Sequence, residues 1–186
     1  MKGGVIRPSR NPWSSPAFIT WRKAYGSQDK PKPRKVIDYR RVNLATPTDC
    51  YPLPDITDTV EWLATHQWFG SVDCKSGYWQ VPLVETAKCK TAFITPDGLW
   101  EYNRVPFGLK NAPPYFIRCI NEALEEDNVE VARAFIDDLM VGRHTWRQYL
   151  AKQLRLLHSL RNRGWLLAAE KARFGYRRIK VLGHVV

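Results

Sequence analysis

Cysteine is scarce in this sequence of 186 residues, and the four that occur lie far apart. No CxxC pair is present and no histidine stands at ligand spacing from a cysteine, so the sequence suggests neither a zinc site nor a disulfide framework. Free thiols are the usual state in a reducing compartment. We therefore expect Cys50, Cys74, Cys89 and Cys119 to be reduced inside a cell.

Long apolar runs are also missing. The N-terminal MKGGVIRPSR lacks the apolar segment of a signal peptide, and no run is long enough to span a bilayer. The chain contains no internal repeat, and its 44% hydrophobic residues with 8 Trp can fill a core. We therefore expect a soluble globular protein that is intracellular, either cytoplasmic or nuclear, and that does not contact a membrane.

Acidic residues are few at both ends of the chain. Residues 1–49 carry a net charge of +8, residues 50–139 carry −7, and residues 140–186 carry +10. Basic surfaces bind phosphate backbones by counterion release, whereas an acidic centre attracts cations. The charge pattern favours nucleic-acid binding; the alternative is a basic surface that serves solubility alone.

The acidic centre contains a paired carboxylate. In AFIDDLMV, Ala134 to Val141, Asp137 and Asp138 stand between two short apolar runs, a pattern typical of a β-hairpin. Two crowded like charges are costly unless a cation or proton neutralises them. This hairpin is therefore either a metal site or an acidic turn that faces water.

A third carboxylate favours the metal site. In SVDCKSGYWQVPL, Ser71 to Leu83, Asp73 follows a strand-like start. Three carboxylates on two neighbouring strands can hold two divalent ions, an arrangement that activates a 3′-hydroxyl and stabilises a leaving pyrophosphate. This chemistry is that of a polymerase.

The remaining pattern predicts a mixed α+β domain. We expect strands at Pro16–Lys23 and Lys35–Asn43, the second ending in an arginine-rich turn, with a mobile basic loop between them. A helix should follow, with a capping box at Asp58 and Glu61. Its predicted apolar stripe consists of Ile56, Val60, Leu63 and Ala64.

Further elements follow along the chain. A hairpin should turn at Pro96–Gly98, and a helix should begin at Pro113 and Pro114. A last helix should start at a capping box of Thr145 and Gln148 and end at Gly164. The expected stripes are Phe116, Ile120, Ala123 and Leu124 in the first helix, and Trp146, Tyr149, Leu150, Leu154, Leu157 and Leu160 in the second. The final IKVLGHVV should be a strand without a partner.

With these motifs assembled, the chain resembles a reverse transcriptase, in particular those of gypsy-type long-terminal-repeat retrotransposons. The resemblance runs from about Gly4 to Val186 and rests on ordered motifs: GVIRPSRNPWSSPAFIT, KVIDYRRVN, YPLPDITDTVEWLA, SVDCKSGYWQVPL, KTAFITPDGLWEYNRVPFGLKNAPPYF, AFIDDLMV, GWLLAAEKARFG and VLGHVV. It implies a right-hand polymerase fold, with a palm whose antiparallel sheet is backed by helices, plus fingers, and with the thumb absent. The fingers would take residues 1–50 and a segment at about 84–110. The palm would take the rest of 51–186, and the primer grip would start at 180–186.

The resemblance also implies the roles of individual residues. Asp73, Asp137 and Asp138 would be the catalytic carboxylates and would bind two Mg²⁺ ions, for which Mn²⁺ can substitute. Lys171 would protonate pyrophosphate, or else contact a phosphate at the surface. The incoming deoxynucleoside triphosphate would meet Arg34, Cys74, Tyr78, Phe107 and Gly108, together with Lys30 or Lys32. Template and primer would meet Arg40, Asn111, Pro113, Phe135, Ile136, Leu182, Gly183 and His184.

Two functions follow as hypotheses. The first is the core of an RNA-directed DNA polymerase that works on an RNA or DNA template with a primer, taken from a retrotransposon polyprotein that supplies the thumb and RNase H domains. The second is a truncated transposon remnant that binds nucleic acid or a protein partner without polymerase activity. A retrotransposon particle is then a further expected location.

Overall fold

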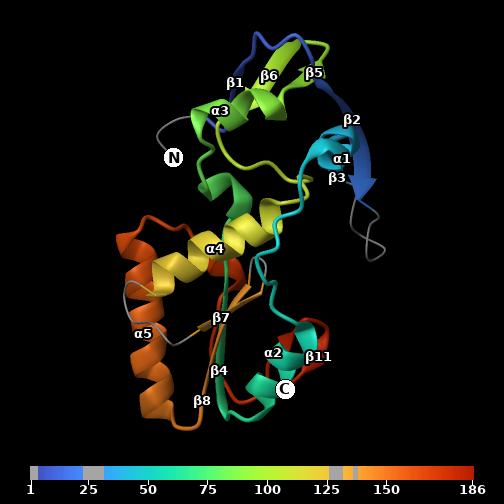
Figure 1. Cartoon of the computed structure of the whole chain (residues 1–186). Helices are drawn as coiled ribbons and strands as arrows, with labels where there is room; N and C mark the ends of the chain where they lie inside the picture. The colour runs from blue at the N-terminus through green and yellow to red at the C-terminus, as the bar shows by residue number, and fades with distance from the viewer. Residues whose placement is uncertain (1–3, 23–31, 126–131, 136–137) are drawn as a thin grey trace. The chain divides into compact units, whose positions relative to one another are not determined.

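The computed structural model describes residues 4–22, 32–125, 132–135 and 138–186. These form two compact units: unit 1 contains Met1–Asp49 and Val81–Ala112, and unit 2 contains Cys50–Gln80 and Pro113–Val186. Both combine short helices with largely antiparallel sheets, which confirms the predicted α+β class (Figure 1). Within the described ranges, no helix is long and apolar enough to cross a membrane.

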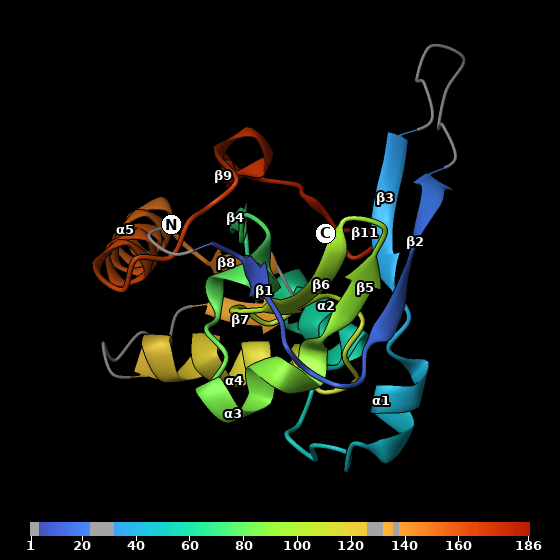
Figure 2. The ribbon, with the colours of Figure 1, turned by 90° about the horizontal axis from the view of Figure 1, so that it is seen from above.

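Unit 1 is built on a five-stranded sheet with the order β1-β6-β5-β2-β3. Its strands are β1 (Ile6–Pro8), β2 (Ser15–Arg22), β3 (Lys32–Ile37), β5 (Phe93–Thr95) and β6 (Gly98–Tyr102). The hairpin predicted at Pro96–Gly98 is confirmed, because β5 and β6 pair antiparallel around it. The strand predicted at Pro16–Lys23 is β2, which pairs with β3 along its length, and Figure 2 shows the two strands leaving the sheet side by side.

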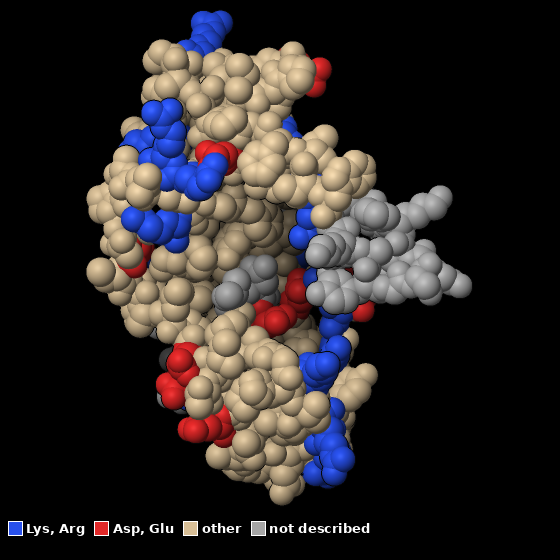
Figure 3. Space-filling view, turned by 90° about the vertical axis from the view of Figure 1, so that its right-hand side faces the viewer, with Lys and Arg blue, Asp and Glu red and all other residues tan. Residues whose placement is uncertain are grey.

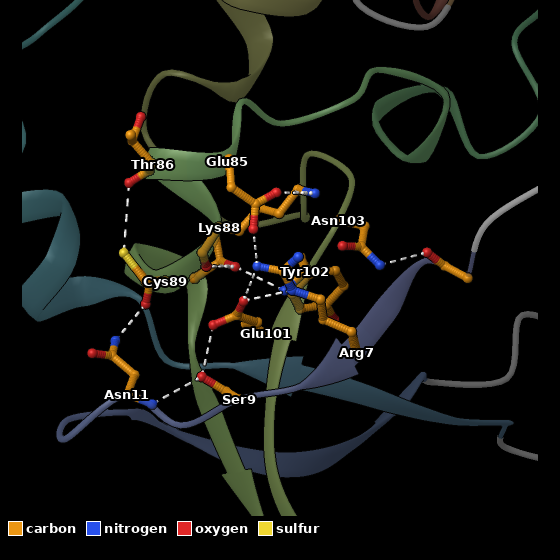
Figure 4. A network of polar contacts seen from close by, with 12 residues as sticks. Arg7, Ser9, Asn11, Glu85, Thr86, Lys88, Cys89, Glu101, Tyr102 and Asn103 are labelled. Atoms are coloured by element: carbon orange, nitrogen blue, oxygen red, sulfur yellow. Dashed lines mark hydrogen bonds and ion pairs between the residues drawn. The ribbon is translucent and has the colours of Figure 1, made fainter.

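A polar network fastens β1 to β6 in unit 1 (Figure 4). The buried Glu101 carboxylate accepts hydrogen bonds from Arg7 Nε at 2.7 Å and from Ser9 Oγ at 2.7 Å. Arg7 also pairs with Glu85, the first residue of α3 (Glu85–Lys88), which leads into the short helix η2 (Cys89–Thr91). The burial of Glu101 is therefore compensated by two donors from β1 and the segment after it.

The second predicted strand, Lys35–Asn43, is wrong in its later half. β3 ends at Ile37 and the arginines begin the helix α1 (Arg40–Ala45). Asp38 Oδ1 accepts a hydrogen bond from Arg40 N at 3.1 Å, which provides an acceptor at the start of the helix. Most of the basic loop predicted before this strand falls on residues 23–31, outside the described residues.

Unit 2 is built on a four-stranded antiparallel sheet with the order β7-β8-β4-β9. Its strands are β4 (Trp68–Asp73), β7 (Ala132–Phe135), β8 (Asp138–Arg143) and β9 (Arg173–Tyr176). The predicted Asp73 strand and the predicted acidic hairpin are therefore neighbours. Central β8 and β4 are largely buried, whereas β9 lies at an edge of the sheet.

Helices α4 (Ala112–Glu125) and α5 (Trp146–Asn162) confirm two predicted helix starts. Pro113 and Pro114 stand in the first turn of α4, and its predicted stripe is buried. The capping box of Thr145 and Gln148 opens α5 as expected. α5 lies against β4, β8 and β9, and its Ser159 Oγ donates to the Ala123 carbonyl of α4 at 3.1 Å.

The predicted capping box of α2 (Ile56–Ala64) is wrong. Its N-cap is Asp55, which accepts hydrogen bonds from Thr57 N at 2.6 Å and Asp58 N at 3.2 Å. The buried residues of α2 are Thr59 and Leu63, so the predicted stripe is wrong except at Leu63. The reason is that the helix begins before Asp58, and a polar threonine takes a place on its inner face.

The predicted inner face of α5 is also partly wrong. Its buried residues are Tyr149, Gln153, Leu156, Ser159 and Leu160. Trp146, Leu150 and Leu154 are 47%, 42% and 57% exposed, although the sequence pattern placed them in the core. α5 carries two adjacent apolar stripes, and periodicity alone does not tell which of them meets the sheet.

The end of the chain is a small hairpin rather than the predicted unpaired strand. β10 (Lys180–Val181) and β11 (His184–Val185) pair antiparallel, and Leu182 and Gly183 turn between them with φ of 50° and 85°. Positive φ at both turn residues is the requirement of a tight two-residue hairpin. The hairpin packs on unit 2 through a core of Leu63, Phe69, Met140, Ile179 and Val181.

Candidate active site

Two of the predicted catalytic carboxylates meet at the end of the unit 2 sheet. Asp73 is the last residue of β4, Asp138 is the first residue of β8, and the two are register partners. Residues directly opposite each other in an antiparallel pair point to the same face. Asp137 and Ile136 lie outside the described residues, and Phe135 ends β7 opposite Asp138.

The carboxylates line a cleft of about 470 Å³. A third predicted site residue that lines this cleft is Lys171, which comes from the short helix η3 (Ala169–Lys171). Lys171 Nζ lies 2.8 Å from Asp73 Oδ2, so the predicted proton donor and a predicted metal ligand form an ion pair. The other residues that line the cleft are Ser71, Glu170, Ala172, Arg173, Tyr176, Lys180, Val181 and Leu182.

Burial and neighbouring charges shift the pKa values of Asp138 and Lys171. Burial, and then the nearby charge of Asp73, raise the pKa of Asp138 above its usual value of 3.8, while Lys171 and Arg173 oppose the shift. The hydrogen bond to Asp73 raises the pKa of Lys171. The cleft therefore favours positive charge beside two carboxylates.

The donor set at this place fits a hard divalent cation. Mg²⁺ prefers carboxylate oxygens and keeps several waters, and an open cleft with two carboxylates at neighbouring strand ends provides both conditions. The ammonium of Lys171 already occupies a cationic position next to Asp73. Across the described ranges, no group of three or more His, Cys, Asp or Glu is placed to hold a metal ion.

The other predicted residues of unit 2 that the structure describes stand in several different elements. Cys74 is buried and forms a β-bridge with Leu167. Tyr78 is buried in η1 (Gly77–Gln80), where its ring meets the Phe116 ring edge-on at 5.4 Å. Pro113 stands in the first turn of α4, Leu182 and Gly183 form the turn of the terminal hairpin, and His184 begins β11.

The predicted residues at the N-terminal side of unit 1 stand in β3 and at the start of α1. Arg34 is exposed in β3 opposite Thr20, and Arg40 pairs with Asp38 at 2.6 Å. Lys32 begins β3, while Lys30 lies outside the described residues.

The segment from Phe107 to Asn111 is fixed by side-chain hydrogen bonds. Phe107 is 46% exposed, and Gly108 has φ +95°, a conformation that favours glycine. Asn43 Nδ2 donates to the Gly108 carbonyl at 2.8 Å. Asn111 accepts from Asp49 N at 3.1 Å and donates to the Pro47 carbonyl at 2.8 Å. The side chain of Asn111 therefore joins this segment to residues 47–49, which follow α1.

Sequence reasoning missed Arg173 and Tyr176 as lining residues of the cleft. Arg173 pairs with Ser71 at the start of β9 and donates to the Lys180 carbonyl at 2.9 Å. The only signal in the sequence was the basic composition of KARFGYRR, because so short an edge strand has no clear alternation.

Comparison with known proteins agrees with this geometry. The profile of the family described as "Reverse transcriptase (RNA-dependent DNA polymerase)" matches residues 23–186. The chain belongs to the reverse transcriptase family. Its assignment from sequence motifs is thereby confirmed.

Relatives of this reverse transcriptase chain occur in transposons and viruses. The chain is 37% identical to the retrovirus-related Pol polyprotein from transposon opus and 33% identical to that from transposon gypsy, both of Drosophila melanogaster, and all of it aligns with 18% of each polyprotein. It is 35% identical to the enzymatic polyprotein of cauliflower mosaic virus (strain Strasbourg), where 96% of the chain covers 26% of that protein. The chain therefore spans about a fifth to a quarter of the length of these relatives.

Solved structures of foamy virus protease-reverse transcriptase share the fold. The complex with an RNA/DNA hybrid aligns with 98% of this chain and 24% of its own, with a TM-score of 0.85 at 21% identity. The complex of a dRH form with double-stranded DNA aligns with 97% of this chain and 31% of its own, with a TM-score of 0.81 at 20% identity. The expected right-hand polymerase fold of the reverse transcriptase chain is confirmed.

Proposed function

We propose that this chain is the catalytic core of an RNA-directed DNA polymerase, which adds deoxynucleotides to a primer paired with an RNA or DNA template. The observation that carries the proposal is the register pair of Asp73 and Asp138 at the mouth of one cleft. Two neighbouring carboxylates repel each other when both are charged. Their arrangement is therefore stable only where a cation or another positive group lies beside them. We assign the palm to unit 2 and the fingers to unit 1.

The carboxylates would act as metal ligands. Asp73, Asp137 and Asp138 would hold two Mg²⁺, or Mn²⁺, ions, which when bound lower the pKa of the primer 3′-hydroxyl and neutralise charge on the departing pyrophosphate. Asp73 and Asp138 are positioned for this task by the β4–β8 ladder rather than by a loop. Such rigid placement keeps the geometry of a polar site constant.

Lys171 of the cleft, and Tyr78 and Arg34 outside it, would handle the phosphates and the sugar. Lys171, whose ammonium is exposed in the cleft, would donate a proton to a pyrophosphate oxygen. Tyr78 would lie under the sugar and exclude a 2′-hydroxyl, a role supported by the rigid edge-on contact of its ring with Phe116. Arg34 would bind the triphosphate through its guanidinium fork.

The basic surface of the chain would bind template and primer. Figure 3 shows a row of Lys and Arg side chains on one side of unit 2. Residues 140–186, all of which belong to unit 2, carry a net charge of +10. The related foamy virus protein has been solved with an RNA/DNA hybrid and with double-stranded DNA. Binding that depends on these charges should weaken steeply as salt rises.

The test is deoxynucleotide incorporation on a poly(rA)/oligo(dT) primer-template with Mg²⁺ or Mn²⁺. Asp73→Asn, and the Asp137→Asn, Asp138→Asn double variant, should each lower incorporation by about a hundredfold or more. Glu61→Gln is the matched control, because Glu61 is an exposed carboxylate of α2 away from the cleft, and it should leave the rate unchanged.

Binding of the same duplex separates the two functions. If the chain binds the primer-template in a salt-dependent way but does not extend it, the polymerase proposal fails. The nucleic-acid-binding transposon remnant would then be the better description. Equal incorporation by the wild-type chain and Asp73→Asn would overturn the assignment of the carboxylates.

A further inference from the structure

Helix α5 of unit 2 presents a row of large apolar side chains to solvent. Trp146, Leu150 and Leu154 are 47%, 42% and 57% exposed, and their spacing of four residues places them along one ridge of the helix. The ridge runs about 12 Å along the helix axis. The sheet-facing residues Tyr149, Leu156 and Leu160 are separate from this row and fully buried, so Leu150 and Leu154 are not needed to seat α5 on its own sheet.

The ridge begins at a fixed aromatic side chain. The Trp146 ring lies 4.8 Å from the Trp68 ring and 5.5 Å from the Tyr149 ring, measured between centroids. Arg177 covers Trp68 with its guanidinium 3.8 Å from the ring centroid. Because these neighbours hold Trp146 in place, its exposed edge can serve as a rigid anchor that loses little conformational entropy on binding.

The charge beside the ridge has one sign. From Trp146 to Gly164 the sequence contains Arg147, Lys152, Arg155, Arg161 and Arg163 and no acidic residue. Arg147 and Arg161 are exposed and project within about 60° of the centre of the ridge. A partner that covers the ridge therefore meets positive charge along its border.

We propose that the ridge of Trp146, Leu150 and Leu154 is a docking surface for an amphipathic protein helix with acidic flanks. A helix suits the ridge because the i, i+4 row of one helix packs into the groove of another. Acidic flanks suit it because they match the arginines beside the ridge. Two of the three side chains of the ridge are leucines, which give nucleic acid nothing to stack upon, and the surface is distinct from the cleft of Asp73 and Asp138.

The direct test uses a designed peptide as the probe. A labelled helical peptide of about five turns, with leucines on one face and glutamates on both flanks, is titrated with the full chain and followed by fluorescence anisotropy. We expect saturable binding that weakens about tenfold or more in the Leu150→Ala, Leu154→Ala double variant. The matched control is Leu53→Ala with Ile56→Ala, which removes two exposed apolar side chains (54% and 43%) of unit 2 away from α5 and should leave binding unchanged.

A second variant tests charge complementarity independently of the leucines. The Arg147→Glu, Arg161→Glu double variant should bind the acidic peptide more weakly than the wild-type chain does. It should bind more tightly a peptide in which lysines replace the glutamates. Circular dichroism melts should show that all variants fold, since every substituted side chain is exposed.

Several results would overturn the proposal. Equal binding of the acidic peptide to the wild-type chain and to both α5 variants would show that the ridge is not the site. A dimer of the chain in sedimentation that Leu150→Ala, Leu154→Ala converts to monomer would show that a second copy covers it. Binding to phosphatidylserine vesicles that the same variant loses, without binding of the acidic peptide, would assign the ridge to a membrane surface.

Discussion

Lys171 Nζ and Asp73 Oδ2 lie 2.8 Å apart, and this ion pair joins η3 to the end of β4 across the candidate active site. The lysine side chain is 61% exposed, whereas that of Asp73 is 22% exposed. The pair is therefore a contact at the surface of a cleft. Because water can hydrate both groups once they separate, the ammonium can leave the carboxylate at a small cost in free energy.

Replacing this lysine should separate catalysis from stability. Lys171→Gln should lower incorporation by about a hundredfold, because a proton donor or a phosphate contact is lost, while Lys171→Arg should recover part of the rate through its charge. The free energy of unfolding should change by less than about 1 kcal/mol, since the pair is exposed. Primer extension and urea unfolding measure the two effects. A large loss of stability with unchanged incorporation would show that Lys171 is structural.

Asp138 should make stability depend on pH. Burial and Asp73 raise the pKa of Asp138 above 3.8, so between 3.8 and that raised value the folded chain binds more protons than the unfolded chain. Stability contributed by this group therefore falls as pH rises through that window. Asp138→Asn should be more stable than the wild-type chain at pH 7, and the difference should shrink as pH falls towards 3.8. Urea unfolding of both chains across this pH range measures the difference in the free energy of unfolding. A stability gain in Asp138→Asn that does not vary with pH would contradict the charge explanation.

Gly70 should not tolerate a side chain. A Cβ atom there would lie 2.5 Å from both Gln153 Oε1 and Tyr149 Oη, and 3.2 Å from the Arg173 carbonyl oxygen. Gly70→Ala should therefore lower the free energy of unfolding by about 1–3 kcal/mol. In the Gly70→Ala background, Tyr149→Phe should lower the free energy of unfolding by less than it does in the wild-type chain, because it removes the hydroxyl that crowds the new methyl group. Additive effects in this double-mutant cycle would exclude the predicted clash.

The two apolar stripes of α5 should respond differently to truncation. Leu156 is fully buried between α5 and the sheet, so Leu156→Ala should lower the free energy of unfolding by about 2–5 kcal/mol. Leu154 is 57% exposed, and Leu154→Ala should change it by no more than about 0.5 kcal/mol. Denaturant unfolding of both variants measures the difference. Equal losses would mean that the ridge is buried in the isolated chain.

Local chemistry explains which parts of the fold could be predicted. The acidic hairpin, the Asp73 strand, the hairpin at Pro96–Gly98 and the start of α5 each depend on neighbouring residues, such as a turn sequence or a capping pair. The site followed from them because antiparallel neighbours bring Asp73 opposite Asp138. Sequence spacing was sufficient where a contact was local or formed between neighbouring strands.

The errors have a common physical cause in tertiary packing. The inner face of α5 was predicted correctly at Tyr149 and Leu160 but wrongly at Leu150 and Leu154, because the sheet, and not the helix, selects the stripe that is buried. The last strand lacked a predicted partner because its hairpin depends on positive φ at Leu182, which a leucine does not suggest. Arg173 was missed because β9 is placed by its pairing with β4, a strand about a hundred residues earlier in the chain.

That long-range pairing of β4 has a consequence for synthesis on the ribosome. All residues of unit 1 have been synthesised once Ala112 has been added. In unit 2, by contrast, β4 pairs with β8 on one side and with β9 on the other, and both strands are synthesised later. At roughly 5–20 residues per second, the wait from Asp73 to Arg173 is about 5–20 s. Until β8 has been made the apolar WFGSVD strand has two unsatisfied edges, and until β9 has been made it has one. A nascent chain is therefore most exposed to misassembly, and to capture by chaperones, at the strand that carries Asp73.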